Sequence, residues 1–125
     1  MRDGDWSEAE ARITRLGRML PLPEISEGTS YGTPALLVKG KSFIRLKDPG
    51  TLVLLCPLEQ KELLIEMAPH IYFETDHYKG WAAVLIRLAA ISDAELSQRL
   101  AEGWRHRAPK RLAAAYPLSN GENGG

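Results

Sequence analysis

Apolar residues near the start of the chain recur at the three- and four-residue spacing of an amphipathic helix. Four of them share one helical face: Ala9, Ile13, Leu16 and Leu20. Ser7 and Glu10 have the spacing of a capping box, which satisfies free amide groups at a helix start. Because proline cannot continue a helix, the pattern predicts a first helix that begins at Ser7 and ends before Pro21.

The next segment has the pattern of consecutive strands. Residues 35–39 and 42–47 flank Gly40-Lys41, which is predicted to be a two-residue turn, and residues 51–56 follow the turn signal Asp48-Pro49-Gly50. With that turn, the hairpin face that meets the helices carries Ala35, Leu37, Ile44 and Leu46. The other face is half apolar and half basic, and it carries Leu36, Val38, Phe43, Arg45 and Lys47.

A second helix is predicted after Pro57, because proline suits the first helical position. Its apolar side consists of Leu63, Leu64, Met67 and Ala68. Two strands are predicted after it, at residues 70–75 and 82–89. On the second of these, Ala83, Leu85 and Arg87 share one face, and Val84, Ile86 and Leu88 share the other.

The last helix has the clearest start signal in the chain. Ser92 and Glu95 have the capping-box spacing, and Ile91 can pack on Leu96 as a hydrophobic staple. The apolar stripe continues through Leu100 to Trp104, so Trp104 is predicted to anchor this helix on the sheet. Pro109 ends the helix, and residues 110–116 are expected to form a short extra turn or two.

The predicted order is therefore helix, three strands, helix, two strands, helix. Short turns between consecutive strands favour antiparallel pairing, so the fold class is α+β with two layers. We expect an antiparallel five-stranded sheet with the helices on one face. Residues 7–116 are expected to form this single domain, and residues 1–6 and 117–125 are expected to be disordered ends.

Length and charge narrow the possible functions. A chain of 125 residues fits one domain, and its 16 basic and 16 acidic residues cancel. Because nucleic-acid binders usually carry excess positive charge, such binding would have to rest on a local patch. The single cysteine, Cys56, cannot form an internal disulfide and is expected to be buried. No segment resembles a signal peptide or a membrane span, so we expect a cytoplasmic protein with no membrane contact.

Two polar, glycine-bearing segments, residues 27–34 and 74–81, are the candidate binding segments. The second contains Asp76-His77-Tyr78, residue types that serve in acid–base chemistry. Adjacent side chains of an extended segment point to opposite sides, and no motif marks a nucleophile, so no enzyme activity is predicted. Nor do His70, His77 and His106 have zinc-site spacing, so no metal or other cofactor is expected.

If the two segments meet in space, they form the expected ligand pocket. Tyr31 and Trp81 would supply apolar walls, with Tyr78 beside them, and Ser30 and His77 would offer polar contacts. In the alternative, the two segments are ordinary turns placed far apart, and Tyr78 and Trp81 cover a core edge.

Positive charge gathers in two places. Residues 39–47 carry four cations and no acid, and a second cluster surrounds His106. Either cluster could contact phosphates. A solvated hairpin edge and the cation preference of helix C-termini explain the same residues without a ligand.

Five segments in order resemble the MmcQ/YjbR family: Gly28-Thr-Ser-Tyr-Gly-Thr-Pro34, Phe43-Ile-Arg-Leu46, Phe73-Glu-Thr-Asp-His-Tyr-Lys-Gly-Trp81, Val84-Leu-Ile-Arg-Leu88 and Ala108-Pro-Lys110. The resemblance extends from about residue 21 to residue 116. It implies a fold similar to those of secretion chaperones and frataxin. It also implies DNA binding through a double wing formed by the hairpins.

Residues and resemblance together predict a non-enzymatic binding protein that binds DNA weakly and electrostatically through its basic hairpin. The candidate nucleic-acid contacts are Lys39, Lys41, Arg45, Lys47, Arg87, Lys110 and Arg111. Two alternatives stay open. One is a protein-interaction module, including a homodimer, that uses the half-basic sheet face, and the other is a small-molecule binder that uses the pocket.

Overall fold

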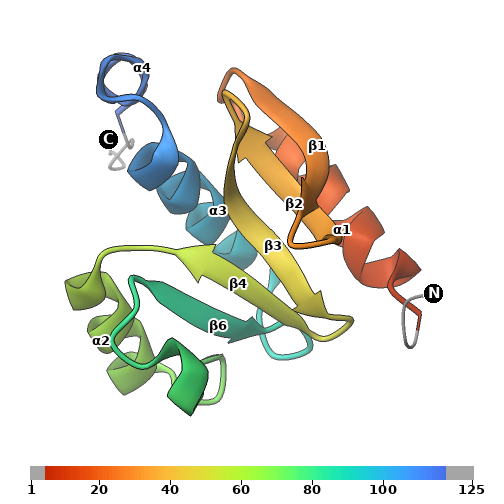
Figure 1. The fold of residues 1–125 in the computed structure, drawn as a ribbon, viewed down its shortest axis with the longest axis vertical. Helices are drawn as coiled ribbons and strands as arrows, with labels where there is room; N and C mark the ends of the chain where they lie inside the picture. Colours follow the sequence, from red (N-terminus) through yellow and green to blue (C-terminus); the bar gives the residue numbers. More distant parts are fainter. Residues whose placement is uncertain (1–4, 118–125) are drawn as a thin grey trace.

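The computed structural model describes residues 5–117. Its strands form one antiparallel sheet in the order β1-β2-β3-β4-β6-β5 (Figure 1). The strands are β1 Ile25–Ser30, β2 Thr33–Val38, β3 Lys41–Asp48, β4 Thr51–Leu55, β5 Tyr72–Phe73 and β6 Ala83–Arg87. The α+β class is therefore confirmed, but the sheet has six strands and not five. The additional strand is β1, which precedes the predicted hairpin.

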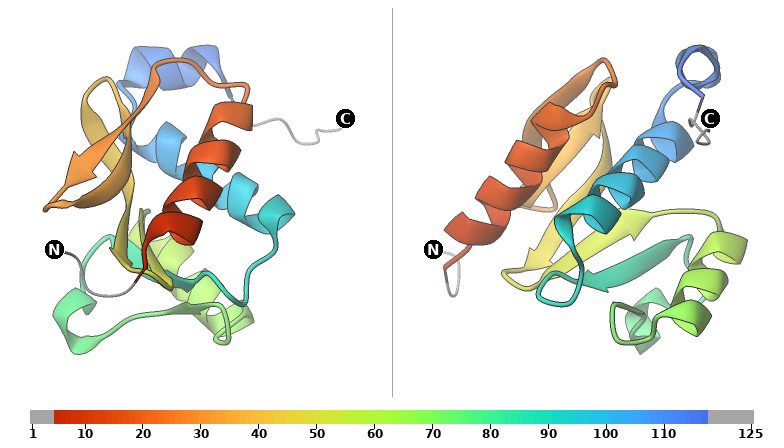
Figure 2. Two further views of the ribbon diagram at one scale, coloured as in Figure 1. Left: turned by 90° about the vertical axis from the view of Figure 1, so that its right-hand side faces the viewer. Right: turned by 180° about the vertical axis from the view of Figure 1, so that it is seen from behind.

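The helices are α1 Ser7–Met19, α2 Leu58–Met67, α3 Asp93–Arg107 and α4 Lys110–Ala115. Seen from behind, α1 and α3 lie in front of the strands, so they cover one face of the sheet (Figure 2). The shorter α2 packs beside β5 and β6, and α4 follows α3. No long helix of residues 5–117 covers the opposite face of the sheet. Within the described part of the chain, no helix has the length and apolar character needed to cross a membrane.

The main core lies between the sheet and the pair α1 and α3. Trp104 lies in this core and is 0% exposed, as predicted from the apolar stripe on the last helix. Its indole Nε1 donates a 3.0 Å hydrogen bond to the carbonyl of Pro23. Gly103 allows α3 to lie close to the strands, because a Cβ there would be 2.8 Å from Leu54 Cδ1. Burial of Cys56 also agrees with the sequence prediction.

The β2–β3 turn is one residue earlier than predicted. Val38 pairs with Lys41, so the turn is Lys39-Gly40, and both of its residues have positive φ, as a type I′ turn requires. A bulge between Leu36 and Leu37 shifts the register further. The predicted faces were consequently wrong in part. Ile44 and Leu46 are in the helix-side core as predicted. Leu36, Val38 and Phe43, which were assigned to the other face, are in that core too, and Ala35 pairs with Arg45 on the open face.

Of the two predicted capping boxes, the structure confirms a cap at one helix start and not at the other. Ser92 caps α3, since its side chain accepts a hydrogen bond from the Glu95 N–H, as predicted. The capping box predicted at Ser7 is absent, because Ser7 is itself the first helical residue and its N–H donates to the Asp5 carboxylate. Trp6 was expected in a loose end, but it is buried in the core. The other residues predicted to be disordered, except Asp5 and Pro117, lie outside the described range.

Candidate functional site

Arg45 lies at the centre of the open sheet face. The strand register places Ala35, Arg45, Val53 and Leu85 side by side across β2, β3, β4 and β6. Arg45 Nη2 donates a 2.8 Å hydrogen bond to the Tyr78 hydroxyl. The Arg45 guanidinium carbon also lies 5.1 Å from the centre of the Tyr31 ring, within cation–π range. One arginine thus contacts both glycine-bearing segments.

Residues 76–78, which were expected to be extended, form a 3-10 helix, η1 Asp76–Tyr78. This turn places Tyr78 over the open face, where it is buried against Val53, Ala83 and Leu85. Two other rings of the segment remain exposed. His77 and Trp81 lie nearly parallel, with their ring centres 6.1 Å apart. The segment therefore covers part of the sheet with one aromatic ring and presents two more beside it.

A buried lysine fixes the position of this segment. Lys61 of α2 is 2% exposed, and its ammonium group lies 2.7 Å from a carboxylate oxygen of Glu74. The same group donates hydrogen bonds of 2.7 Å to the Tyr78 carbonyl and 2.9 Å to the Trp81 carbonyl. An ammonium group has three hydrogens, so all three are used and the charge is paired.

This burial corrects the predicted apolar side of α2. Leu64 is buried as predicted, but Leu63 and Met67, which were assigned to the same side, are exposed. The other buried residue of the helix is Lys61. Lys61 precedes Leu64 by one helical turn, so both lie on one side of α2. Hydropathy cannot identify such a residue, because a buried lysine and a solvated one look the same in a sequence.

The two glycine-bearing segments meet along a groove of about 770 Å³. The five residues considered for a ligand pocket all line it: Ser30, Tyr31, His77, Tyr78 and Trp81. Further lining comes from β3, β4 and β6 and from the end of α3, at Ser42, Val53, Leu55, Ala83 and Arg107. The arrangement with the two segments far apart is thereby excluded.

The charged residues that line the groove are all positive within the described part of the chain. They are Lys41, Arg45 and Arg107, and no aspartate or glutamate of residues 5–117 lines it. Because the chain as a whole is neutral, this groove is a local patch of the kind that phosphate binding requires. Arg107 belongs to the basic cluster near the end of the last helix but was not among the candidate contacts.

The other candidate cations do not line the groove. Lys39 lies in the β2–β3 turn, Lys47 near the far end of β3, and Lys110 and Arg111 on α4, and all four are exposed. Arg87 lies at the opposite end of β6 from Ala83. Its guanidinium covers the Phe73 ring at 3.9 Å and donates to the Pro69 carbonyl. Proximity in the sequence therefore did not identify which of these cations lie at the groove.

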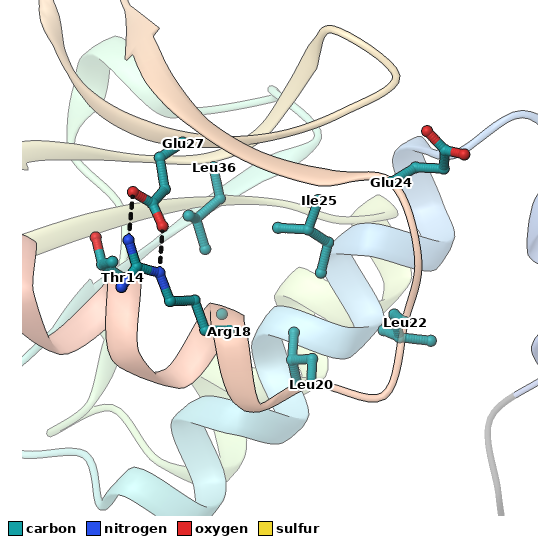
Figure 3. Close-up of a pocket in the computed structure, with 9 residues that line it drawn as sticks. Thr14, Arg18, Leu20, Leu22, Glu24, Ile25, Glu27 and Leu36 are labelled. Atoms are coloured by element: carbon teal, nitrogen blue, oxygen red, sulfur yellow. Dashed lines mark hydrogen bonds and ion pairs between the residues drawn. The ribbon is translucent and has the colours of Figure 1, made fainter.

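A second cavity, of about 180 Å³, lies between the end of α1 and β1. Figure 3 shows apolar side chains, among them Leu20, Ile25 and Leu36, around its interior. Arg18 lies at its edge and forms an ion pair with Glu27, with Nε 2.7 Å from Oε2. Arg18 and Glu27 neutralise each other, and the third charged lining residue is an acid, Glu24, so this cavity is poorly suited to an anionic ligand.

The ionisable groups with shifted pKa values lie outside the groove, and burial or hydrogen bonding explains each shift. Burial raises the pKa of the Cys56 thiol to about 11. Burial, together with a hydrogen bond to Glu95, also raises the pKa of Tyr72, whereas burial lowers the pKa of His106. Hydrogen bonds from Arg12 and Arg15 lower the pKa of Asp93. Among residues 5–117, no group of three histidine, cysteine or carboxylate side chains has an arrangement that could hold a metal ion.

Known proteins match most of this chain, including the 27–34 and 74–81 segments. A family model described as YjbR matches residues 20–106. Two proteins described as uncharacterized, one from Mycobacterium bovis and one from Mycobacterium tuberculosis, are each 41% identical to this chain over 78 residues. The matched part covers 62% of this chain and 54% of each relative, so the chain spans about half the length of the curated relatives it matches. No solved structure matches. Since the family model covers well over half of the chain and both groove segments, the chain belongs to the YjbR family.

Proposed function

We propose that this protein binds nucleic acid along the groove on its open sheet face and acts as a binding module without catalysing a reaction. The observation that carries the proposal is the composition of the groove. Three cations, Lys41, Arg45 and Arg107, line it together with exposed aromatic rings, and no acidic side chain of residues 5–117 does. A positively charged groove with interleaved aromatic rings is a common arrangement for nucleic acid.

The expected affinity is modest and sensitive to salt. Neutralising phosphates releases counterions, so each cation that reaches a phosphate makes binding weaker as salt rises. With three groove cations, the logarithm of the affinity should fall with the logarithm of the salt concentration at a slope of about −2 for a single strand. This role is narrower than binding by the whole basic hairpin, because only two of the hairpin's four cations, Lys41 and Arg45, line the groove.

The two alternative functions have different support. Self-association was suggested by a sheet face with Leu36, Val38 and Phe43 exposed, but these residues are buried against the helices. A small anionic aromatic ligand, such as a nucleotide, would use the same cations and rings as a nucleic acid. The volume of about 770 Å³ lies within the range of small-molecule sites, so a nucleotide is the second candidate.

The proposal can be tested with charge reversals and a labelled DNA oligonucleotide of about 16 nucleotides, near the upper end of known site sizes. Lys41→Glu/Arg107→Glu reverses two groove cations. Lys110→Glu/Arg111→Glu makes the same change in net charge on the first turn of α4, where acidic residues suit a helix start. Fluorescence anisotropy at low salt should show about a tenfold or greater loss for the groove variant and less than about a threefold loss for the control. Equal losses for the two variants, or no binding by the wild type, would contradict the proposal.

A further inference from the structure

We infer that the groove accepts a single strand, with one unpaired base stacked on Tyr31 and another on Trp81. This inference rests on the proposed function and specifies its substrate class. The two rings come from different parts of the chain, Tyr31 from the β1–β2 turn and Trp81 from the segment before β6, and both line the groove. Tyr31 is 88% exposed and Trp81 is 57% exposed, so each ring has surface free for a base.

The backbone at Tyr31 is unusual for an aromatic residue. Tyr31 and Gly32 form a two-residue turn, and Tyr31 has a φ of +53°, a conformation that favours glycine or asparagine. A residue held in this way is strained and often marks a binding site. Folding does not require an aromatic ring there, because the ring is almost fully exposed. In the groove, the ring faces the guanidinium of Arg45, which lies 5.1 Å from the ring centre.

Trp81 is exposed, but its backbone is fixed. Its carbonyl accepts a hydrogen bond of 2.9 Å from buried Lys61, and its N–H donates one of 3.0 Å to the Tyr78 carbonyl. The His77 ring lies nearly parallel to the indole, at an angle of 25°. A ring that is positioned before binding loses little conformational freedom when a base stacks on it.

These features favour a single strand over a duplex. The bases of a duplex are paired and stacked on each other, so exposed protein rings cannot reach their faces, and only the cations would contribute. An unpaired base that stacks on an aromatic ring strengthens binding by roughly 5- to 150-fold. Arg45 lies beside Tyr31, and Lys41 and Arg107 line the same groove, so phosphates can be neutralised near the stacked bases.

The experiment compares a labelled single strand with a duplex of the same sequence, using anisotropy with wild type and ring variants. Tyr31→Leu and Trp81→Leu remove a ring without changing the charge, whereas Tyr31→Phe keeps the ring. Tyr116→Leu is the control for loss of a ring elsewhere, since Tyr116 is partly exposed, packs edge-on against Trp104 and does not line the groove. Circular dichroism verifies that each variant is folded.

The single strand should bind more tightly than the duplex. Each leucine variant should lose about tenfold in affinity for the single strand. Tyr31→Phe and Tyr116→Leu should bind like wild type, and duplex binding should be unchanged in all variants.

Different results would overturn the single-strand inference and the proposed function. Equal or tighter duplex binding, or single-strand binding that tolerates both leucine variants, would overturn the inference. If Lys41→Glu/Arg107→Glu still weakened binding in that case, the proposed function would stand. If neither nucleic acid bound the wild type, both claims would be wrong.

Discussion

The guanidinium of Arg45 donates a 2.8 Å hydrogen bond to the hydroxyl of Tyr78 across the open face of the sheet. This bond joins β3, within the acid-free basic run of residues 39–47, to the 74–81 segment. The Tyr31 ring lies over the same guanidinium, so the 27–34 segment meets them there. Three features that are separate in the sequence therefore share one surface.

Arg45 is expected to contribute to binding through its charge. Arg45→Met should weaken oligonucleotide binding about tenfold and make the salt slope shallower by about 0.7, because one phosphate contact is lost. Tyr78→Phe is the control, since it removes the hydrogen bond and leaves the cation in place. Anisotropy across a salt series gives both quantities. Equal losses in the two variants would show that the hydrogen bond, and not the charge, determines binding.

Lys61 is expected to stabilise the fold through its buried contacts. Lys61→Met leaves the Tyr78 and Trp81 carbonyls and the Glu74 carboxylate without their donor, which should reduce the free energy of unfolding by about 3–5 kcal/mol. Glu74→Gln should cost less, because Glu74 is partly exposed. Urea denaturation of both variants makes the comparison. A stability like wild type for Lys61→Met would show that the ammonium group is not needed to hold this segment.

Trp104 is expected to dominate the contact between α3 and the sheet. Trp104→Ala should reduce the free energy of unfolding by about 3–5 kcal/mol, because it empties a fully buried site and removes the bond to Pro23. Trp81→Ala, at an exposed tryptophan, should change stability by about 0.5 kcal/mol or less. Denaturant melts measure both. A loss below about 1 kcal/mol for Trp104→Ala would contradict this packing.

Stability is expected to fall in alkaline solution, partly because of Cys56. Burial raises the pKa of this thiol from its ordinary 9.0 to about 11. The unfolded chain therefore ionises at lower pH than the folded one, so the contribution is fully present below pH 9.0 and is lost as the pH rises through about 11. Cys56→Ala removes the contribution of the thiol. The fall in stability should then be smaller but not absent, because the raised pKa of Tyr72 acts in the same direction. Identical pH profiles for wild type and Cys56→Ala, from melts across this range, would show that the thiol does not contribute.

Much of the helical layer was predictable because its signals are local. The Ser92 cap and the buried Trp104 follow from residues a few positions apart. The two faces of β6 were also correct, since Val84 and Ile86 are in the main core and Ala83 and Leu85 pack under Tyr78. In each case the pattern within one element was sufficient.

The errors concern features that depend on partners far away in the chain. The β1 strand was missed because apart from Ile25 it consists of serine, threonine, glycine and glutamate, so it has no apolar alternation. The hairpin faces were wrong at Leu36, Val38 and Phe43, because a turn displaced by one residue and a bulge decide which residues pair. The groove itself depends on Lys61, whose contacts are 13 to 20 residues away in sequence. The meeting of Tyr31 and His77 was a hypothesis that only the fold could decide.

Binding of nucleic acid by the groove on the open face can be observed residue by residue. Isotopically labelled protein is titrated with a single-stranded oligonucleotide, and amide chemical shifts are followed in NMR spectra. The largest shifts should occur at Tyr31, Lys41, Arg45, His77 and Trp81, and the amides of Arg18 and Glu27 beside the second cavity should be unchanged. Shifts concentrated on α2 or α4, or no shifts at all at low salt, would contradict binding in the groove.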